Sequence, residues 1–347
     1  MNGILLAEFR SRVEEIANYW LYLTSAARLS EGDLAEVSGG TLFLIRQMNS
    51  SVSPGLRKTF DYSSIVVALY GAIEDFVERL VERCVDVIND AAPTYQSLPS
   101  EMRRQHERLS IRLSERIDHP SYMGPLNLRT IIDNLNGCLT GQRNFRLNRE
   151  AFALHTANVR NDVIRDMFKA ISIPNIDSAV AAHRLTYDLL SELGRSQRDA
   201  HFYINDLASR RNVVAHGERP YDVISVSMMD EYFRAVDTYG QALYESAVLG
   251  IFALIGPVRS SPLGSPTATY RSGRVVCFQP EVAFDVKIGS RILWQSQKSW
   301  KIAQIDSLQV NREALECYAG EPRSKIGLGI SRNGNNKARY WLLSDWA

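Results

Sequence analysis

The chain has 347 residues, of which 45% are hydrophobic and 23% are charged, as is ordinary for a globular protein long enough to form two domains. The formal net charge of +1 excludes any argument for nucleic-acid binding from the charge of the whole chain. The charge is uneven: residues 268–347 hold 12 Lys and Arg against 7 Asp and Glu (+5), which leaves −4 for the remainder.

Cysteine usage and hydropathy narrow the class of protein further. The four cysteines are scattered without the spacing of a metal site, so we expect free thiols and no metal or other cofactor. Charged residues interrupt the N-terminus too early for a signal peptide, and the longest apolar run, 246–258, is too short to span a bilayer. We therefore expect a cytoplasmic protein without a membrane partner.

The first predicted elements are two helices. Residues 4–27 carry an apolar face and belong to a helical extension that we place at residues 1–60. The helix over residues 62–88 has the most regular apolar stripe, and Pro93 prevents its extension. Glu74 and Asp75 lie mostly off this stripe. We interpret them as solvated residues, or as acid–base carboxylates if the fold places one of them beside the site described below.

Residues 101–116 predict a charged, exposed helix with five arginines. These arginines either follow the phosphates of an RNA or belong to a solvated helix, in which Glu101, Glu107 and Glu115 partly balance their charge. We favour the solvated helix. Further helices are predicted over 126–139, 150–170, 177–193 and 225–255.

The pattern changes after residue 255. Residues 256–273 contain three prolines and several Ser and Gly, which indicates a linker. Beyond it, Asn333-Gly334 is typical of a hairpin turn. Short β segments follow one another, which predicts a small barrel or curled sheet: 274–279, 283–288, 291–295, 300–310, 326–331 and 339–343. Four aromatic residues of this region either pack in its core, which we favour, or stack on bases: Trp294, Trp300, Tyr340 and Trp341.

The predicted elements are organised around residues 201–220. Apolar residues recur there at helical spacing, and Gly217 followed by Pro220 is a helix stop signal. His216 should therefore lie in the last turn, where the helix dipole favours a protonated imidazole. Asn212 lies four residues before His216 and shares its face, whereas Arg211 lies about 140° round the helix from it.

A family resemblance rests on this stretch. The run from Arg211 to His216 reads RNVVAH, is followed by Gly217, and resembles the Arg-Asn-x-x-x-His signature of the HEPN superfamily. A looser pattern, Arg followed by His some residues later, is also met from Arg210 and elsewhere. Only the match from Arg211 combines the Asn, a helical frame and the glycine stop. Residues 148–173 are similar to the segment that precedes the motif helix in a toxin- and defence-associated HEPN branch. The helix over 62–88 fits that branch's first bundle helix.

The resemblance implies an all-α bundle that dimerises so that two motifs face one cleft, and for many members a metal-independent endoribonuclease activity. It makes Arg211, Asn212 and His216 the candidate catalytic residues. RNA cleavage by its own 2′-OH needs a base, an acid and stabilisation of negative charge. His216 can act as base or acid, Arg211 can hold the phosphate, and Asn212 can orient the phosphate or the histidine. A two-fold dimer would bring a second histidine.

We therefore expect a mainly α protein in which a HEPN-like helical bundle is followed by a small β-rich, barrel-like domain. The predicted divisions are a helical extension (1–60), a HEPN-like domain (61–255), a linker (256–273) and a basic β-rich domain (274–347). The expected function is a homodimeric endoribonuclease that cuts RNA as a toxin or in antiviral defence, with an antitoxin or an ATPase as a candidate partner. The alternative is a non-catalytic HEPN-type module that binds a protein or RNA.

Overall fold

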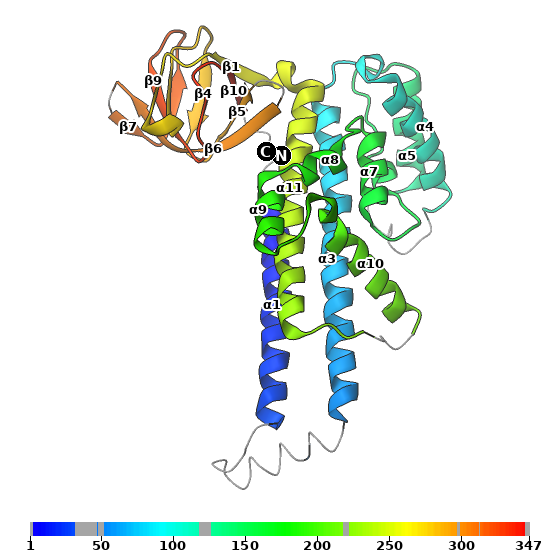
Figure 1. Ribbon diagram of the computed structural model, residues 1–347. Helices are drawn as coiled ribbons and strands as arrows, with labels where there is room; N and C mark the ends of the chain where they lie inside the picture. Colours follow the sequence, from blue (N-terminus) through cyan, green and yellow to red (C-terminus); the bar gives the residue numbers. More distant parts are fainter. Residues whose placement is uncertain are drawn as a thin grey trace.

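Three long helices form the backbone of the molecule and lie side by side in the computed structural model (Figure 1). The structure describes residues 3–31, 47, 52–117, 126–217, 222–296, 299–311 and 313–343. The long helices are α1 (Ile4–Glu31), α3 (Pro54–Ala91) and α11 (Val226–Arg259). Helix α3 begins earlier than predicted because Ser53 accepts the Leu56 N–H at 3.3 Å and Pro54 suits a first turn. Because α1 shares one hydrophobic core with α3 and α11, residues 4–31 are part of the bundle.

Shorter helices pack against this frame, several of them on the side of α3 away from α1 (Figure 1). They are α4 (Ser100–Ser114), α5 (Leu128–Leu139), α6 (Arg149–Ala153), α7 (Asn161–Ala170), α8 (Ile176–Ala181), α9 (Arg184–Glu192) and α10 (Phe202–Ala215), with single 3₁₀ turns η1 (Tyr95–Ser97), η3 (Gln197–Asp199) and η4 (Arg271–Gly273). Two predicted helices were wrong as continuous elements. The one over 150–170 is interrupted between α6 and α7, where the Val159 N–H bonds to the Tyr70 hydroxyl instead of a helix carbonyl. The one over 177–193 is interrupted at His183, whose ring accepts the Leu185 N–H at the start of α9.

The C-terminal region is a curled antiparallel sheet, which confirms the predicted fold class. Its strands are β1 (Ser260–Gly264), β2 (Ala268–Tyr270), β3 (Val275–Phe278), β4 (Phe284–Lys287), β5 (Arg291–Ser296), β6 (Ser299–Val310), β7 (Glu313–Leu315), β8 (Cys317–Gly320), β9 (Ile326–Ile330) and β10 (Arg339–Leu343). The strand order is β1-β10-β5-β6-β9-β3-β2, with β7 on β6 and a separate β4–β8 pair. The sheet curls because the first half of the long β6 pairs with β5 and the second half with β9.

Aromatic residues fill the core of this sheet, as favoured from the sequence. Trp294 and Tyr340 are fully buried and stack with ring centroids 5.4 Å apart. Trp341 packs edge-on against Phe252 of α11, and the side chain of Trp300 lies outside the described part of the chain. The hairpin predicted at Asn333-Gly334 was wrong: these residues connect β9 to β10, which are not neighbours in the sheet.

The sheet is joined directly to the bundle. Residues 256–273, predicted as a linker, contain the end of α11 and strands β1 and β2 instead, because β1 finds its pairing partner in the distant β10. Leu293, Ile302 and Leu343 of the sheet belong to the hydrophobic core of the bundle. Among the described helices, none is long and apolar enough to cross a bilayer.

Candidate active site

Helix α10 ends as the sequence predicts. His216 caps it, with its backbone N–H bonded to the Asn212 carbonyl at 3.0 Å. Gly217 follows with φ of +73°, in the left-handed region that glycine adopts without strain, and its N–H bonds to the Val214 carbonyl at 3.1 Å. The His216 side chain is exposed and makes no hydrogen bond or ion pair with any residue that the structure describes. The stop signal therefore leaves an imidazole free at a helix end.

One residue outside the motif holds the other two motif side chains. Asn158, in the segment between α6 and α7, accepts a hydrogen bond from Arg211 Nη1 at 3.2 Å. Its amide nitrogen donates to the Asn212 side-chain carbonyl. The Arg211 guanidinium also lies over the Tyr70 ring, 5.1 Å from its centroid, in a cation–π contact. Arg211 and Asn212 are therefore oriented together, and most of the Arg211 N–H groups remain available to an anion.

Tyr70 links this pair to a carboxylate. Its hydroxyl donates to Glu74 Oε1 at 2.7 Å and accepts the Val159 N–H at 2.8 Å. Burial, and then the bond to Glu74, raise the pKa of Tyr70, so that it stays a donor at neutral pH. Asp75 instead lies 3.6 Å from both Arg12 and Arg79, toward α1. The fold thus brings Glu74, and not Asp75, to the motif, although no contact joins Glu74 to His216 among the described residues.

His155 adds a positive charge that the sequence analysis did not assign. Its Nε2 lies 2.7 Å from Glu78 Oε1, and its Nδ1 lies 2.7 Å from the Ala157 carbonyl. Both partners accept hydrogen bonds, so this geometry favours an imidazole that is protonated on both ring nitrogens. The bond to Glu78 outweighs burial and raises the pKa of His155. With both N–H groups engaged, His155 supplies charge rather than proton transfer.

The sequence held a weak signal for this segment. A continuous helix over 150–170 would place Asn158 and Asn161 in its interior, where asparagine competes with the helix by bonding to the backbone. In the structure Asn158 and Asn161 lie in or beside the break between α6 and α7. Two asparagines so close together were therefore a reason to expect an interruption there.

A basic groove adjoins the motif. It has a volume of about 490 Å³ and is walled by α4, residues 154–157 and α7. Arg104, Arg108 and Arg112 recur every fourth residue of α4 and line this groove, as do Lys169 and His155. Arg104 bonds to Glu101 at 2.7 Å and Arg108 to Gln105 at 2.7 Å, and all three arginines are exposed. We call this feature the arginine groove. Among the described residues there is no cluster of His, Cys, Asp or Glu suited to a metal ion.

The comparisons with known proteins identify the family of the chain. A family model described as RiboL-PSP-HEPN matches residues 42–248, which is more than half of the chain and includes α3, α10 and most of α11. No curated protein and no solved structure matched the chain. The match includes the motif helix, the segment that carries Asn158, and Tyr70 and Glu74. The protein is therefore a member of the RiboL-PSP-HEPN family.

Proposed function

We propose that the protein is a metal-independent endoribonuclease that acts as a homodimer on RNA in the cytoplasm, as a toxin or in antiviral defence. The observation that carries this proposal is the arrangement at the end of α10. Arg211 and Asn212 are fixed by Asn158 beside Tyr70, while the adjacent His216 is exposed and unbonded among the described residues. Membership of the HEPN family supports the same activity.

The reaction fits these side chains. The 2′-OH of RNA attacks the neighbouring phosphorus, the bond from phosphorus to the 5′-oxygen breaks, and the products are a 2′,3′-cyclic phosphate and a 5′-hydroxyl. His216 takes the 2′-OH proton or gives a proton to the departing oxygen. Arg211, positively charged at any physiological pH, binds the phosphate and stabilises the charge that develops on it. Asn212 orients the phosphate.

The dimer supplies the second proton-transfer group. Among the described residues, each protomer offers one histidine at this site with free ring nitrogens, because His155 has both of its own bonded. Two exposed apolar residues support such a pairing on the same face of α3 as Glu74: Phe60 and Val67 precede it at intervals of two helical turns and are 63% and 45% exposed. We propose that two copies pair across this face and share one cleft that contains both His216 side chains.

The arginine groove supports RNA as the substrate. A nuclease must hold a polyanion beside its reactive groups, and Arg and Lys side chains supply most of the affinity for a phosphate backbone. His155 lies in the wall of the groove and bonds to Glu78 on α3. Glu74 lies one helical turn from Glu78 and bonds to Tyr70, whose ring contacts Arg211.

The test is cleavage of total RNA in EDTA by wild type, His216→Ala and Arg211→Ala, with folding matched by circular dichroism and dimerisation followed by light scattering. We expect cutting by the wild type only, with cyclic-phosphate ends. Equal cutting by wild type and both variants would overturn the site, and dependence on a divalent metal would overturn the mechanism.

A non-catalytic HEPN-type interaction module is the second candidate. The observation that favours it is that the His216 side chain makes no hydrogen bond to the side chain of Arg211 or Asn212 within the part of the chain that the structure describes. Expression in cells separates the two candidates. A nuclease toxin should express poorly and recover with His216→Ala, whereas an interaction module should express equally in both forms.

A further inference from the structure

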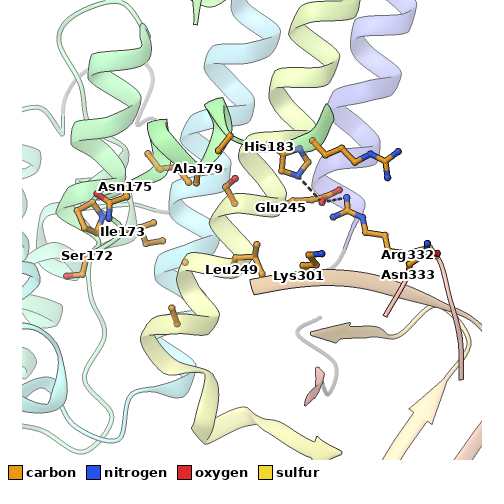
Figure 2. Close-up of a pocket in the computed structure, with 18 of the residues that line it drawn as sticks. Ser172, Ile173, Asn175, Ala179, His183, Glu245, Leu249, Lys301, Arg332 and Asn333 are labelled. Atoms are coloured by element: carbon orange, nitrogen blue, oxygen red, sulfur yellow. Dashed lines mark hydrogen bonds and ion pairs between the residues drawn. The ribbon is translucent and has the colours of Figure 1, made fainter. Parts of the chain in front are cut away.

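A second, larger cavity lies where the helical bundle meets the sheet (Figure 2). Its volume is about 1040 Å³, and it shares no lining residue with the arginine groove or with the motif. One wall is formed by the turn before α8, by residues from α8 to the start of α9 and by α11, and the other by Arg274 just before β3, by β6 and by the turn after β9. Small-molecule sites have volumes of about 300–1,000 Å³ and occur preferentially between structural units, so this cavity is large enough for a ligand. We call it the bundle–sheet cavity.

The bundle side of this cavity is apolar. Ile173 and Ile176 are at most 7% exposed, and Leu249 of α11 lies beside them, as Figure 2 shows for Ile173 and Leu249. Ile173 packs directly on the backbone at Gly250, where an added Cβ would come within 2.6 Å of it. This wall is therefore closed and well packed, and it offers a surface to the non-polar part of a ligand.

A three-residue polar network spans the two walls. The Arg332 Nη2 of the sheet donates to Glu245 Oε2 of α11 at 2.7 Å. His183 Nδ1 accepts the Leu185 N–H at 3.3 Å, so its Nε2 carries the proton and donates to the same carboxylate at 3.1 Å. Burial opposes ionisation of Glu245, but His183 and Arg332 outweigh it and lower its pKa. Glu245 is thus a fixed anion that holds Arg332 at the cavity (Figure 2).

The cavity carries an excess of positive charge. Its lining contains four cationic side chains, Arg184, Arg274, Lys301 and Arg332, against the single carboxylate of Glu245. Arg184 is neutralised by Asp188 at 3.2 Å and Arg332 by Glu245. Among the described residues, the Arg274 side chain bonds only to the carbonyls of Ile330 and Ser331, and Lys301 is exposed with no acidic partner. Two positive charges therefore remain for a ligand.

We propose that the bundle–sheet cavity binds a phosphorylated small molecule of nucleotide size. Its phosphates would contact Lys301, Arg274 and the free N–H groups of Arg332, and its organic part would lie against Ile173, Ile176 and Leu249. Lysine and arginine bind phosphate through charge-assisted hydrogen bonds, and two uncompensated cations match a di- or triphosphate better than a single carboxylate. A ligand held by both walls also connects the sheet to the bundle, so its binding stabilises their arrangement.

The proposal is tested on the full-length His216→Ala variant in EDTA, by titration calorimetry and thermal unfolding. The probes are ATP, GTP, CTP and UTP, inorganic tripolyphosphate, which has the phosphates without the nucleoside, and adenosine, which has no phosphate. We expect at least one nucleotide to bind and to raise the Tm, tripolyphosphate to bind more weakly, and adenosine not to bind. Absence of binding by all four nucleotides would overturn the proposal, and equal affinity for tripolyphosphate would overturn the role of the apolar wall.

Variants locate the site. Lys301→Gln should weaken the binding about tenfold, the loss expected for one hydrogen bond to a charged group, without affecting folding because Lys301 is exposed. Lys337→Gln, which removes an exposed cation of the sheet outside the cavity, should leave the affinity unchanged. The double variant Arg108→Gln/Arg112→Gln should also leave it unchanged. Loss of nucleotide binding in that variant, or unchanged binding in Lys301→Gln, would place the nucleotide elsewhere and refute the site.

Discussion

Helix α10 carries two adjacent arginines, Arg210 and Arg211, whose side chains are hydrogen-bonded to very different extents. Arg210 Nε bonds to Asp206 at 2.5 Å, and its Nη1 bonds to the Tyr62 hydroxyl and the Asp222 carbonyl at 2.9 Å each, so its side chain is only 17% exposed. Among the described residues, the Arg211 side chain makes one hydrogen bond, to Asn158, and lies over the Tyr70 ring. Both arginines precede His216 at distances that the loose Arg–His pattern allows. The structure distinguishes them by bonding capacity: that of Arg210 is used inside the bundle, and that of Arg211 is largely free.

The largest effect should follow from changing Arg211, whose N–H groups are largely free. Arg211→Gln removes the charge that binds the phosphate, and RNA cleavage should fall by about 100-fold or more, which is the loss typical of one electrostatic contact to a transition state. The midpoint of urea unfolding should hardly change, because Arg211 stabilises the fold through a single hydrogen bond and a ring contact. Cleavage rates at matched folded concentration check this prediction. A fully active Arg211→Gln protein would remove Arg211 from the site.

A change at Arg210 should have the opposite result and affect stability rather than activity. Arg210→Ala leaves Asp206 and the Tyr62 and Tyr232 hydroxyls without their shared cation, and it should lower the free energy of unfolding by about 3 kcal/mol. Cleavage per folded molecule should stay within a few-fold of wild type. Urea unfolding measures the loss, with Arg211→Ala as the neighbouring control. An Arg210→Ala protein that kept its stability and lost activity instead would contradict the structural role given to Arg210.

Local sequence signals were sufficient for much of this arrangement. The periodicity of α10 and the Gly217 stop predicted a helix that ends at His216, and the alternating apolar residues of β5, β6 and β9 predicted those strands. These features depend on residues within a few positions of one another. The motif itself predicted Arg211 as the candidate catalytic arginine, and the hydrogen bonds show that Arg210 is engaged inside the bundle.

Contacts between distant residues decided what was missed. The break after α6 exists because the Val159 N–H bonds to Tyr70, which is distant in the sequence. This break lets Asn158 bond to Arg211 and His155 bond to Glu78. Strand β1 was taken for a linker because Ser260 pairs with Leu343 at the far end of the chain. Neither partner is visible in local composition, so a single sequence does not predict them.

Changes in the arginine groove should have an intermediate effect. On the His216→Ala background, Arg108→Gln/Arg112→Gln should weaken binding of single-stranded RNA about tenfold at low salt. The slope of log K against log salt should become shallower by about 1.4, or about 0.7 for each lost phosphate contact. Fluorescence anisotropy across a salt series measures both quantities. The control Arg116→Gln/Arg129→Gln removes two exposed arginines that do not line the groove, and equal losses in both variants would indicate general charge attraction only.

The smallest effect concerns the cation at the groove wall. The folded-state pKa of His155 is raised by Glu78, so this pair stabilises the fold below the ordinary histidine pKa of about 6.5 and loses that contribution as pH rises through the folded pKa. The Glu78 side chain is 40% exposed, which limits the coupling free energy to about 0.5 kcal/mol. Glu82 lies one turn along α3, and burial and the nearby Glu150 raise its pKa to about 7. Glu78→Gln alone would therefore also relieve the repulsion between Glu78 and Glu82 at high pH.

A double-mutant cycle with Glu78→Gln and His155→Gln separates the pair from Glu82, because the effect of Glu82 on each single change cancels in the coupling term. Urea unfolding should give the full coupling at pH 5.5 and almost none at pH 8.5. A coupling of the same size at both pH values would mean that His155 is bonded to Glu78 as a neutral ring. The wall of the arginine groove would then lack the positive charge of His155.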